Sequence, residues 1–246
     1  MKSYEQITKL PCLAGVPAET LAEIEACGRI ERYKKGDVLF RAGETCDQVY
    51  FLLEGQTIIY TLTGEGSRKI IFILGGGTLQ NDSILGGIKN TIFCEAISNC
   101  RVFVIPLSEF IHFMEADFSL VRAVSKIQER KLWRTSHQLK NTMGSIFLEK
   151  KLAAKLWKLS RDFGKKDAKD PLRVTIQIPL SITFLADLLG APRETTSRIC
   201  KNLVSKDLIR MERKTITIPN TDCLAAFYKS HCDCQGEKCK VCHVLN

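Results

Sequence analysis

Residues 178–198 read IPLSITFLADLLGAPRETTSR, and this stretch decides the fold of the second half of the chain. Ser181 precedes an apolar run, and its hydroxyl can accept a hydrogen bond from a free amide in the first turn of a helix. The run predicts a helix over 182–189, the residues Gly190-Ala191-Pro192 predict a three-residue turn, and a second helix follows over 193–205. Two short helices joined by a glycine-containing turn indicate a helix-turn-helix.

A hairpin is predicted after the second helix. Residues 208–211 and 215–218 alternate as strands around the turn Glu212-Arg213-Lys214, so the motif is predicted to be winged. Ile199, Leu203 and Val204 are expected to form the core-facing side of the second helix.

Three polar residues of this helix share the other face. Glu194, Ser197 and Arg198 are three and four residues apart, which places them on one side. Arginine can take the O6 and N7 acceptors of guanine, and glutamate can accept a hydrogen bond from the N4 amine of cytosine. The same spacing also suits an exposed salt bridge between Glu194 and Arg198, so the pattern alone leaves both interpretations open.

Charge is distributed unevenly along the 246 residues. Residues 1–115 hold 11 Lys and Arg against 14 Asp and Glu, whereas residues 116–246 hold 25 against 13, and the net charge is +9. A basic second half indicates a polyanionic partner, although a solvated lysine-rich surface would have the same composition.

The first half is rich in short alternating segments separated by glycine turns. After a short helix over 20–26, such segments recur at intervals typical of an all-β sandwich or barrel. They cover residues 29–33, 38–40, 49–53, 56–62, 68–74, 93–96 and 101–105.

Helical periodicity begins at Leu107 and continues to Phe163, after which a charged loop over 164–171 and a strand over 172–178 are predicted. Helices are predicted over 108–114, from Phe118 to about Met143, and over 145–163. The long helix is only partly apolar, with Leu120, Val124, Ile127 and Leu139 among its apolar positions. The apolar stripe of this helix must be covered, either by a second copy of the chain in a dimer or by the helix's own domain.

Residues 174–219 resemble the DNA-binding domain of the Crp/Fnr family. The resemblance lies in Ile-Pro-Leu-Ser at 178–181, Leu-Ala-Asp-Leu-Leu-Gly at 185–190 and Arg-Glu-Thr-Thr-Ser-Arg at 193–198. Residues 35–44 and 49–55 resemble the opening of the family's cyclic-nucleotide-binding β-roll, so the resemblance covers about residues 10–220. It implies an α+β fold with a jelly-roll-like β-roll sensor domain over 1–115, a dimerisation helix over 116–144, a winged helix-turn-helix over 145–220 and a cysteine-rich tail over 221–246.

The resemblance also implies roles for individual residues. Glu194 and Arg198 would read a TGA core in each half of a palindromic double-stranded DNA site, and Ser197 favours a TTGA-like over a TGTGA-like half-site. Arg193 would add a contact, while Thr195, Arg213 and Lys214 would hold phosphates. Expected partners are this DNA, a second copy of the chain and RNA polymerase.

The sequence departs from the family where the effectors of known members bind. The phosphate cassette of a cyclic-nucleotide binder is replaced at 77–83, with Thr78 in place of its Glu and no Arg before Thr91, so cAMP is not expected. Lys89 can substitute for that Arg only in part, because its ammonium group is a point charge rather than a guanidinium fork. Cys12 and Cys27 do not match the N-terminal cysteine cluster of Fnr, and His112 is interpreted as structural rather than as a haem ligand.

The C-terminal tail carries a feature that the family core does not explain. Residues 232–243 read CDCQGEKCKVCH, with thiols at Cys232, Cys234, Cys239 and Cys242. Their close, irregular spacing favours an iron–sulfur cluster of the 4Fe–4S type, and the tail resembles that of Fnr-like regulators with C-terminal ligands without matching their spacing. A structural zinc, a thiol redox pair at Cys239 and Cys242, and no metal at all remain alternatives. A c-type haem attachment fits the motif formally.

These patterns favour a regulator without enzymatic activity and without catalytic residues. Two rivals remain: a ligand-gated regulator with a structural zinc or thiol tail, and a redox enzyme or electron carrier built on the tail. Gly75-Gly76-Gly77 lacks the spacing of a phosphate-binding loop. The first residues lack a secretory signal and no apolar run approaches about 20 residues, so a cytoplasmic protein with no membrane association is expected.

Overall fold

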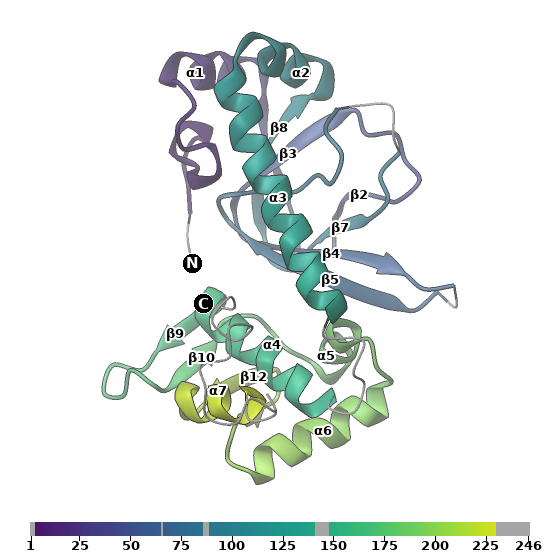
Figure 1. Ribbon diagram of the computed structural model, residues 1–246, viewed down its shortest axis with the longest axis vertical. Coiled ribbons are helices and arrows are strands. Elements are labelled where there is room, and N and C mark those ends of the chain that lie inside the picture. The colour runs from purple at the N-terminus through teal and green to yellow at the C-terminus, as the bar shows by residue number, and fades with distance from the viewer. Residues whose placement is uncertain (1–2, 65, 86–88, 141–147, 230–246) are drawn as a thin grey trace. The chain divides into compact units, whose positions relative to one another are not determined.

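The structure is a computed structural model that describes residues 3–64, 66–85, 89–140 and 148–229. The chain divides into two compact units, Met1–Lys140 and Asn141–Asn246, and each has its own secondary structure (Figure 1). Among the described residues, no helix combines the length and the apolar character needed to cross a membrane.

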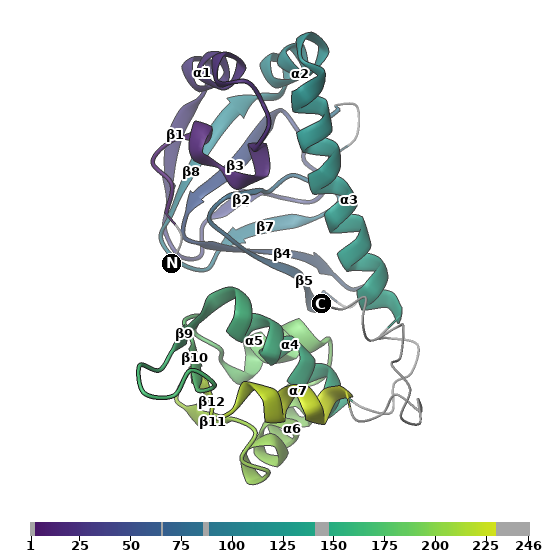
Figure 2. The same ribbon diagram turned by 60° about the vertical axis from the view of Figure 1, so that its left-hand side comes forward.

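The first unit is a β-roll of two antiparallel sheets, visible in Figure 2. One sheet has the order β1-β8-β3-β6 and the other β2-β7-β4-β5. The strands are β1 (Arg29–Tyr33), β2 (Val38–Phe40), β3 (Gln48–Glu54), β4 (Gln56–Leu62), β5 (Arg68–Gly75), β6 (Thr78–Leu79), β7 (Phe93–Ala96) and β8 (Cys100–Pro106). Gly55 joins β3 to β4 with φ of 99°, and a Cβ there would lie 2.5 Å from the carbonyl oxygen of Asn99. The tight turn between the two sheets therefore requires glycine.

Strand β3 takes part in two hydrophobic cores because its side chains alternate. Tyr50 and Leu52 point into the space between the sheets, where they pack with residues such as Phe72. Val49, Phe51 and Leu53 point to the opposite side. That side is covered by the 3-10 turns η1 (Ile7–Lys9) and η2 (Pro11–Leu13) and by α1 (Ala18–Cys27), α2 (Leu107–Ala116) and the start of α3.

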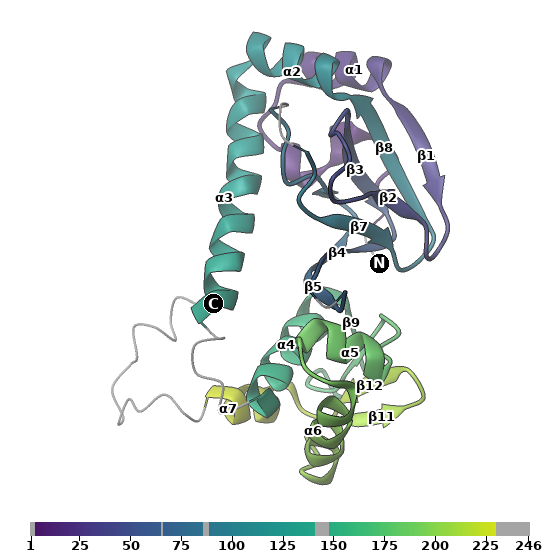
Figure 3. The same cartoon turned by 90° about the vertical axis from the view of Figure 1, so that its right-hand side faces the viewer.

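The long helix α3 (Phe118–Lys140) runs along one side of the β-roll (Figure 3). Leu120 and Val124 are buried against the roll and Ile127 is partly buried, so the predicted apolar stripe packs on its own domain. The side chain of Leu139 lies outside the described residues. A different set faces solvent: Phe118 and Leu132 are each 69% exposed and Trp133 is 46% exposed. Of the two partners considered for the stripe over 120–127, the structure has its own domain.

Further along α3, polar side chains replace apolar ones as the contacts with the β-roll. Lys131 Nζ donates hydrogen bonds to the carbonyl oxygens of Gln80 at 3.2 Å and Asn81 at 2.5 Å. Gln138 donates to Ile71 O at 2.9 Å, and the Arg134 guanidinium lies 4.9 Å from the centre of the Phe72 ring. The helix is thus held by charge-assisted contacts in its second half.

The segment that receives Lys131 is itself fixed by buried amides. Gln80 Oε1 accepts a hydrogen bond from Thr57 at 2.6 Å, and Gln80 Nε2 donates to Thr78 O at 3.0 Å. The Asn81 side chain accepts from the Tyr50 amide at 2.8 Å. Desolvation lowers the pKa of Lys131 to about 8, with Arg134 adding to the effect while Asp82 opposes it.

Over residues 148–229, the second unit combines four helices with one small sheet. Its elements are α4 (Leu148–Phe163), β9 (Gly164–Lys166), β10 (Val174–Ile176), α5 (Ile182–Leu189), α6 (Arg193–Ser205), β11 (Arg210–Glu212), β12 (Thr215–Ile218) and α7 (Thr221–Lys229), and the sheet has the order β11-β12-β10-β9. Fully buried leucines from α4, α5 and α6, among them Leu156, Leu185 and Leu203, form the core. The predicted α+β fold, with a β-roll, a long helix and a C-terminal winged helix-turn-helix, is confirmed in outline.

Lys131 makes stability depend on pH in a defined direction. Its pKa is lower in the folded state than the ordinary 10.5 of the unfolded chain, so above pH 8 the folded state loses a proton that the unfolded state keeps. We therefore consider the difference between the free energies of unfolding of the wild type and of Lys131→Met. This difference should shift in favour of the wild type by about 2 kcal/mol between pH 7 and pH 10. Urea titrations at both pH values measure this difference.

Lys126→Met is the matched control, because Lys126 lies on the exposed side of the same helix. This variant should follow the wild type between the two pH values. Parallel curves for Lys131→Met and the wild type would show that Lys131 is not the group responsible.

Candidate nucleic-acid interface

The turn between α5 and α6 is fixed by three local features. The Ser181 hydroxyl accepts a hydrogen bond from the Phe184 amide at 3.1 Å, as the sequence predicted. Gly190 ends α5 in the left-handed region with φ of 69°, and its amide donates to Ala186 O. Pro192 then precedes α6, where its fixed φ suits a helix start. These features set the direction in which α6 leaves α5.

One face of α6 is anchored in the core. Thr196, Ile199, Cys200 and Leu203 are buried, and the Thr196 hydroxyl donates to Pro192 O at 3.0 Å. Val204, which was expected on this side, is 43% exposed and does not belong to the buried face. The error arises because Val204 directly follows Leu203, and neighbouring residues on a helix point about 100° apart.

The opposite face carries the predicted base-reading residues. Arg193, Glu194 and Arg198 are exposed, while Thr195 and Ser197 are partly exposed. In the part of the chain that the structure describes, no ion pair joins Glu194 to Arg198. The geometry thus favours side chains available to a ligand over an intrahelical salt bridge.

The predicted wing lies beside the helix-turn-helix. Strands β11 and β12 pair antiparallel, and Arg213 and Lys214 form the two-residue turn between Glu212 and Thr215. Arg213 has φ of 54°, an uncommon conformation for a residue other than glycine. The Leu180 amide donates to Lys214 O at 2.7 Å, which ties the wing to the chain just before α5. All seven residues predicted to contact DNA therefore lie on α6 or on the wing of this one unit.

Sequence reasoning gave no role to Lys131 or to the polar segment that receives it. The helix around Lys131 is rich in charged residues, so a lysine there is expected on the surface and the pattern gives no signal of burial.

The polar side chains in the stretch that corresponds to the family's phosphate cassette are engaged in contacts within the chain: Thr78 donates to Gly75 O, and Thr91 donates to Asp82 at 2.5 Å. Lys89, the residue considered as a substitute for the cassette arginine, is exposed.

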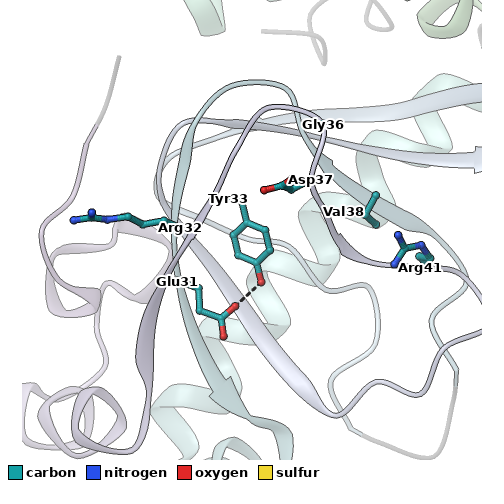
Figure 4. A pocket seen from close by; sticks show the side chains of 7 residues that line it. All are labelled: Glu31, Arg32, Tyr33, Gly36, Asp37, Val38 and Arg41. Atoms are coloured by element: carbon teal, nitrogen blue, oxygen red, sulfur yellow. Dashed lines mark hydrogen bonds between the residues drawn. The ribbon is translucent and has the colours of Figure 1, made fainter.

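A shallow hollow of about 620 Å³ lies at the end of β1 and the turn into β2 (Figure 4). Its Glu31 carboxylate is engaged, because it accepts a hydrogen bond from the Tyr33 hydroxyl at 2.6 Å and pairs with Arg29 at 2.6 Å. Arg32, Asp37 and Arg41 are the other charged groups of its lining, and Figure 4 shows Arg32 pointing away from the tyrosine. The hollow contains none of the predicted site residues.

The cysteines divide by burial. Cys46, Cys94, Cys100 and Cys200 are buried, which confirms Cys94 and Cys200 as small core residues. Burial raises the pKa of Cys12 to about 12 and that of Cys200 to about 11, so both remain thiols at neutral pH. Within the described ranges no three metal-ligating side chains converge. Cys232, Cys234, Cys239 and Cys242 lie outside the described residues.

Comparisons with known proteins agree with this architecture. A family model described as a cyclic nucleotide-binding domain matches residues 30–117, and one described as a Crp-like helix-turn-helix domain matches residues 150–227. The cAMP-activated global transcriptional regulator CRP of Haemophilus influenzae is 24% identical over 195 residues, which are 77% of this chain and 83% of that protein. The fumarate and nitrate reduction regulatory protein of Salmonella typhimurium is 26% identical over 206 residues, covering 80% of this chain and 78% of that protein.

A solved structure shows the same fold. FixK2 from Bradyrhizobium japonicum superimposes with a TM-score of 0.68 at 20% identity, over 80% of this chain and 96% of FixK2. The two matched domains occur in the same order in the sequence as the β-roll and the winged helix occur in the structure. The chain belongs to the Crp/Fnr family of transcription regulators.

Proposed function

We propose that this regulator binds a palindromic DNA site as a homodimer, and that its C-terminal cysteines make the binding respond to oxygen or redox state. The observation that carries the DNA-binding part is the exposed face of α6. Its charged side chains project from a helix whose other face is buried, so the backbone that carries them is held in place before DNA binds.

The assignment of base contacts follows from chemistry and family resemblance together. Arg198 can take both acceptors of a guanine, and Glu194 can accept from a cytosine amine in the major groove. Ser197 favours a TTGA-like half-site, and Arg193 adds a further contact. Thr195, Arg213 and Lys214 hold phosphates, which fixes the register without reading sequence.

The exposed apolar residues of α3 support a dimer. Phe118 and Leu132 are separated by 14 residues, which is two heptads, so they lie on the same side of the helix. A second copy of α3 could cover both residues together with Trp133. Two copies would then present two α6 helices to half-sites about one helical turn apart.

An iron–sulfur cluster is proposed for the tail on the basis of its four thiols alone. Four thiolates within the span 232–242 are the ligand set of a 4Fe–4S cluster, whereas structural zinc usually takes two separated pairs. Such a cluster would supply oxygen sensitivity, because air destroys exposed clusters.

The cytoplasm, where bacterial DNA and RNA polymerase are found, is the proposed location, and RNA polymerase is a proposed partner.

A ligand-gated regulator is the second candidate, and one observation favours it. The β-roll matches a cyclic nucleotide-binding domain, and the partly buried Lys131 of α3 is hydrogen-bonded to that roll. An effector bound in the roll would then act through α3, while the tail would hold zinc or only thiols. The visible spectrum of anaerobically purified protein separates the two candidates, because only the first requires the absorbance of an iron–sulfur cluster.

Two substitutions should separate base reading from phosphate binding. Arg198→Ala should cost about 1–3 kcal/mol at the preferred site and relax discrimination at one base pair, because a bidentate contact is lost. Lys214→Ala should weaken binding to all sequences alike and reduce the slope of log K against log salt by about one. Gel shifts with specific and random duplexes at several salt concentrations measure both effects. Equal weakening on both duplexes by Arg198→Ala would contradict the base-reading role.

The dimer can be tested on α3. Leu132→Asp should convert the protein from a dimer to a monomer at micromolar concentration, because it places a charge in the proposed apolar seam. Leu62→Asp is the control, since Leu62 is also exposed, at 44%, but lies at the end of β4. Light scattering with and without reductant gives the mass. A wild-type monomer under both conditions would refute the dimer.

The tail can be tested by replacing Cys232, Cys234, Cys239 and Cys242 together with serine. The fourfold variant should lose visible absorbance and the response of DNA binding to air, while its far-UV circular dichroism stays unchanged. Retention of iron and of the oxygen response would place the ligands elsewhere. Uptake of zinc but no iron by the reconstituted wild type would favour the ligand-gated candidate.

A further inference from the structure

Three helix ends of the second unit meet at one group of side chains. Glu149 and Lys150 lie in the first turn of α4, Lys206 caps the C-terminus of α6, and Phe227 lies in the last turn of α7. Lys206 Nζ is 2.6 Å from Glu149 Oε1 and 4.9 Å from the centre of the Phe227 ring. Lys150 Nζ lies 5.7 Å from the same ring. We call these four residues the helix-end cluster, and Figure 2 shows α7 lying next to α4.

The helix-end cluster occupies a particular position along the chain. In the sequence, residues 141–147 come directly before α4, and the cysteine tail comes directly after α7. Lys206 ends the helix that carries the base-reading residues, and Asp207, with φ of 52°, turns the chain towards the wing. The helix-end cluster therefore lies on the three helices that adjoin residues 141–147, the wing and the tail in the sequence.

Helix α7 is firmly docked apart from these contacts. Leu224 is fully buried, and the Asn220 side chain caps the helix by accepting hydrogen bonds from the amides of Asp222 at 2.9 Å and Cys223 at 3.0 Å. The Tyr228 ring lies 5.9 Å from the Trp157 ring of α4. The start of α7 is held in place, so a displacement of its C-terminal turn would change its contacts with α4 and with Lys206.

We propose that the helix-end cluster transmits the state of the cysteine tail to α6, with Lys206 and Phe227 as positioning residues. The proposal rests on the function proposed for the tail. When the tail changes state, Phe227 shifts against Lys206, the Lys206–Glu149 pair rearranges, and the C-terminal end of α6 changes its angle to the wing. Partly exposed ion pairs and cation–π contacts are individually weak, so a small displacement can exchange one arrangement for another.

A double-mutant cycle on the full-length chain tests this coupling. The four proteins are the wild type, Lys206→Met, the variant with serine at Cys232, Cys234, Cys239 and Cys242, and the combination. Anaerobic Kd values for one palindromic duplex are measured at fixed salt, and the visible spectrum of each protein is recorded. Lys201→Met is the matched control, because Lys201 is an exposed lysine of α6 outside the helix-end cluster. Phe227→Leu repeats the test with the ring removed but apolar packing kept.

The serine replacements should change Kd roughly tenfold in the wild type and in Lys201→Met, but less than about threefold in Lys206→Met and Phe227→Leu. Lys206→Met should keep the wild-type visible spectrum and circular dichroism, because it removes the transmission and not the sensor. An equal effect of the serine replacements in the wild type and in Lys206→Met overturns the proposal, as does no effect in either. The spectrum reports separately on the proposed function: a wild type without a cluster refutes the iron–sulfur sensor, whether or not the Kd values show coupling.

Discussion

The burial of one face of α6 is the constraint on which the interface depends. Thr196, Ile199 and Leu203 hold the helix against the core, and the hydroxyl of Thr196 also ties its first turn to Pro192. Arginine and glutamate side chains lose considerable rotamer entropy when they bind in a single geometry. A fixed backbone limits that loss to the side chains themselves, so discrimination between bases is possible with few contacts.

Helix α3 is held against the β-roll by different kinds of contact in its two halves. Its first half is held by Leu120 and Val124, whereas its second half is held by polar groups, above all by Lys131. Polar contacts of this kind are directional and can be exchanged for others, unlike a packed apolar seam. The part of α3 nearest to the second unit in sequence is thus the part whose attachment can respond to changes in charge.

The sequence predicted the winged helix well because its signals are local. Ser181 as a cap, Gly190 as a helix end and the spacing of residues 194–198 all act within a few residues, and the structure has each where it was expected. Burial across elements was predicted less well. Lys131 is held by Gln80 and Asn81, which lie about 50 residues away, and no local pattern signals that contact. The sequence left open what covers the apolar stripe of α3, because nothing in the helix itself shows that Leu120 and Val124 pack on the roll.

The wing turn illustrates how selection can hold a position away from the most stable residue. Arg213 adopts φ of 54°, where glycine would be unstrained and arginine costs on the order of 1 kcal/mol. A glycine there would relieve the backbone but remove a guanidinium from the tip of the hairpin. A lineage under selection for thermal stability alone would therefore drift toward glycine at this position, and one under selection for a cationic wing would not.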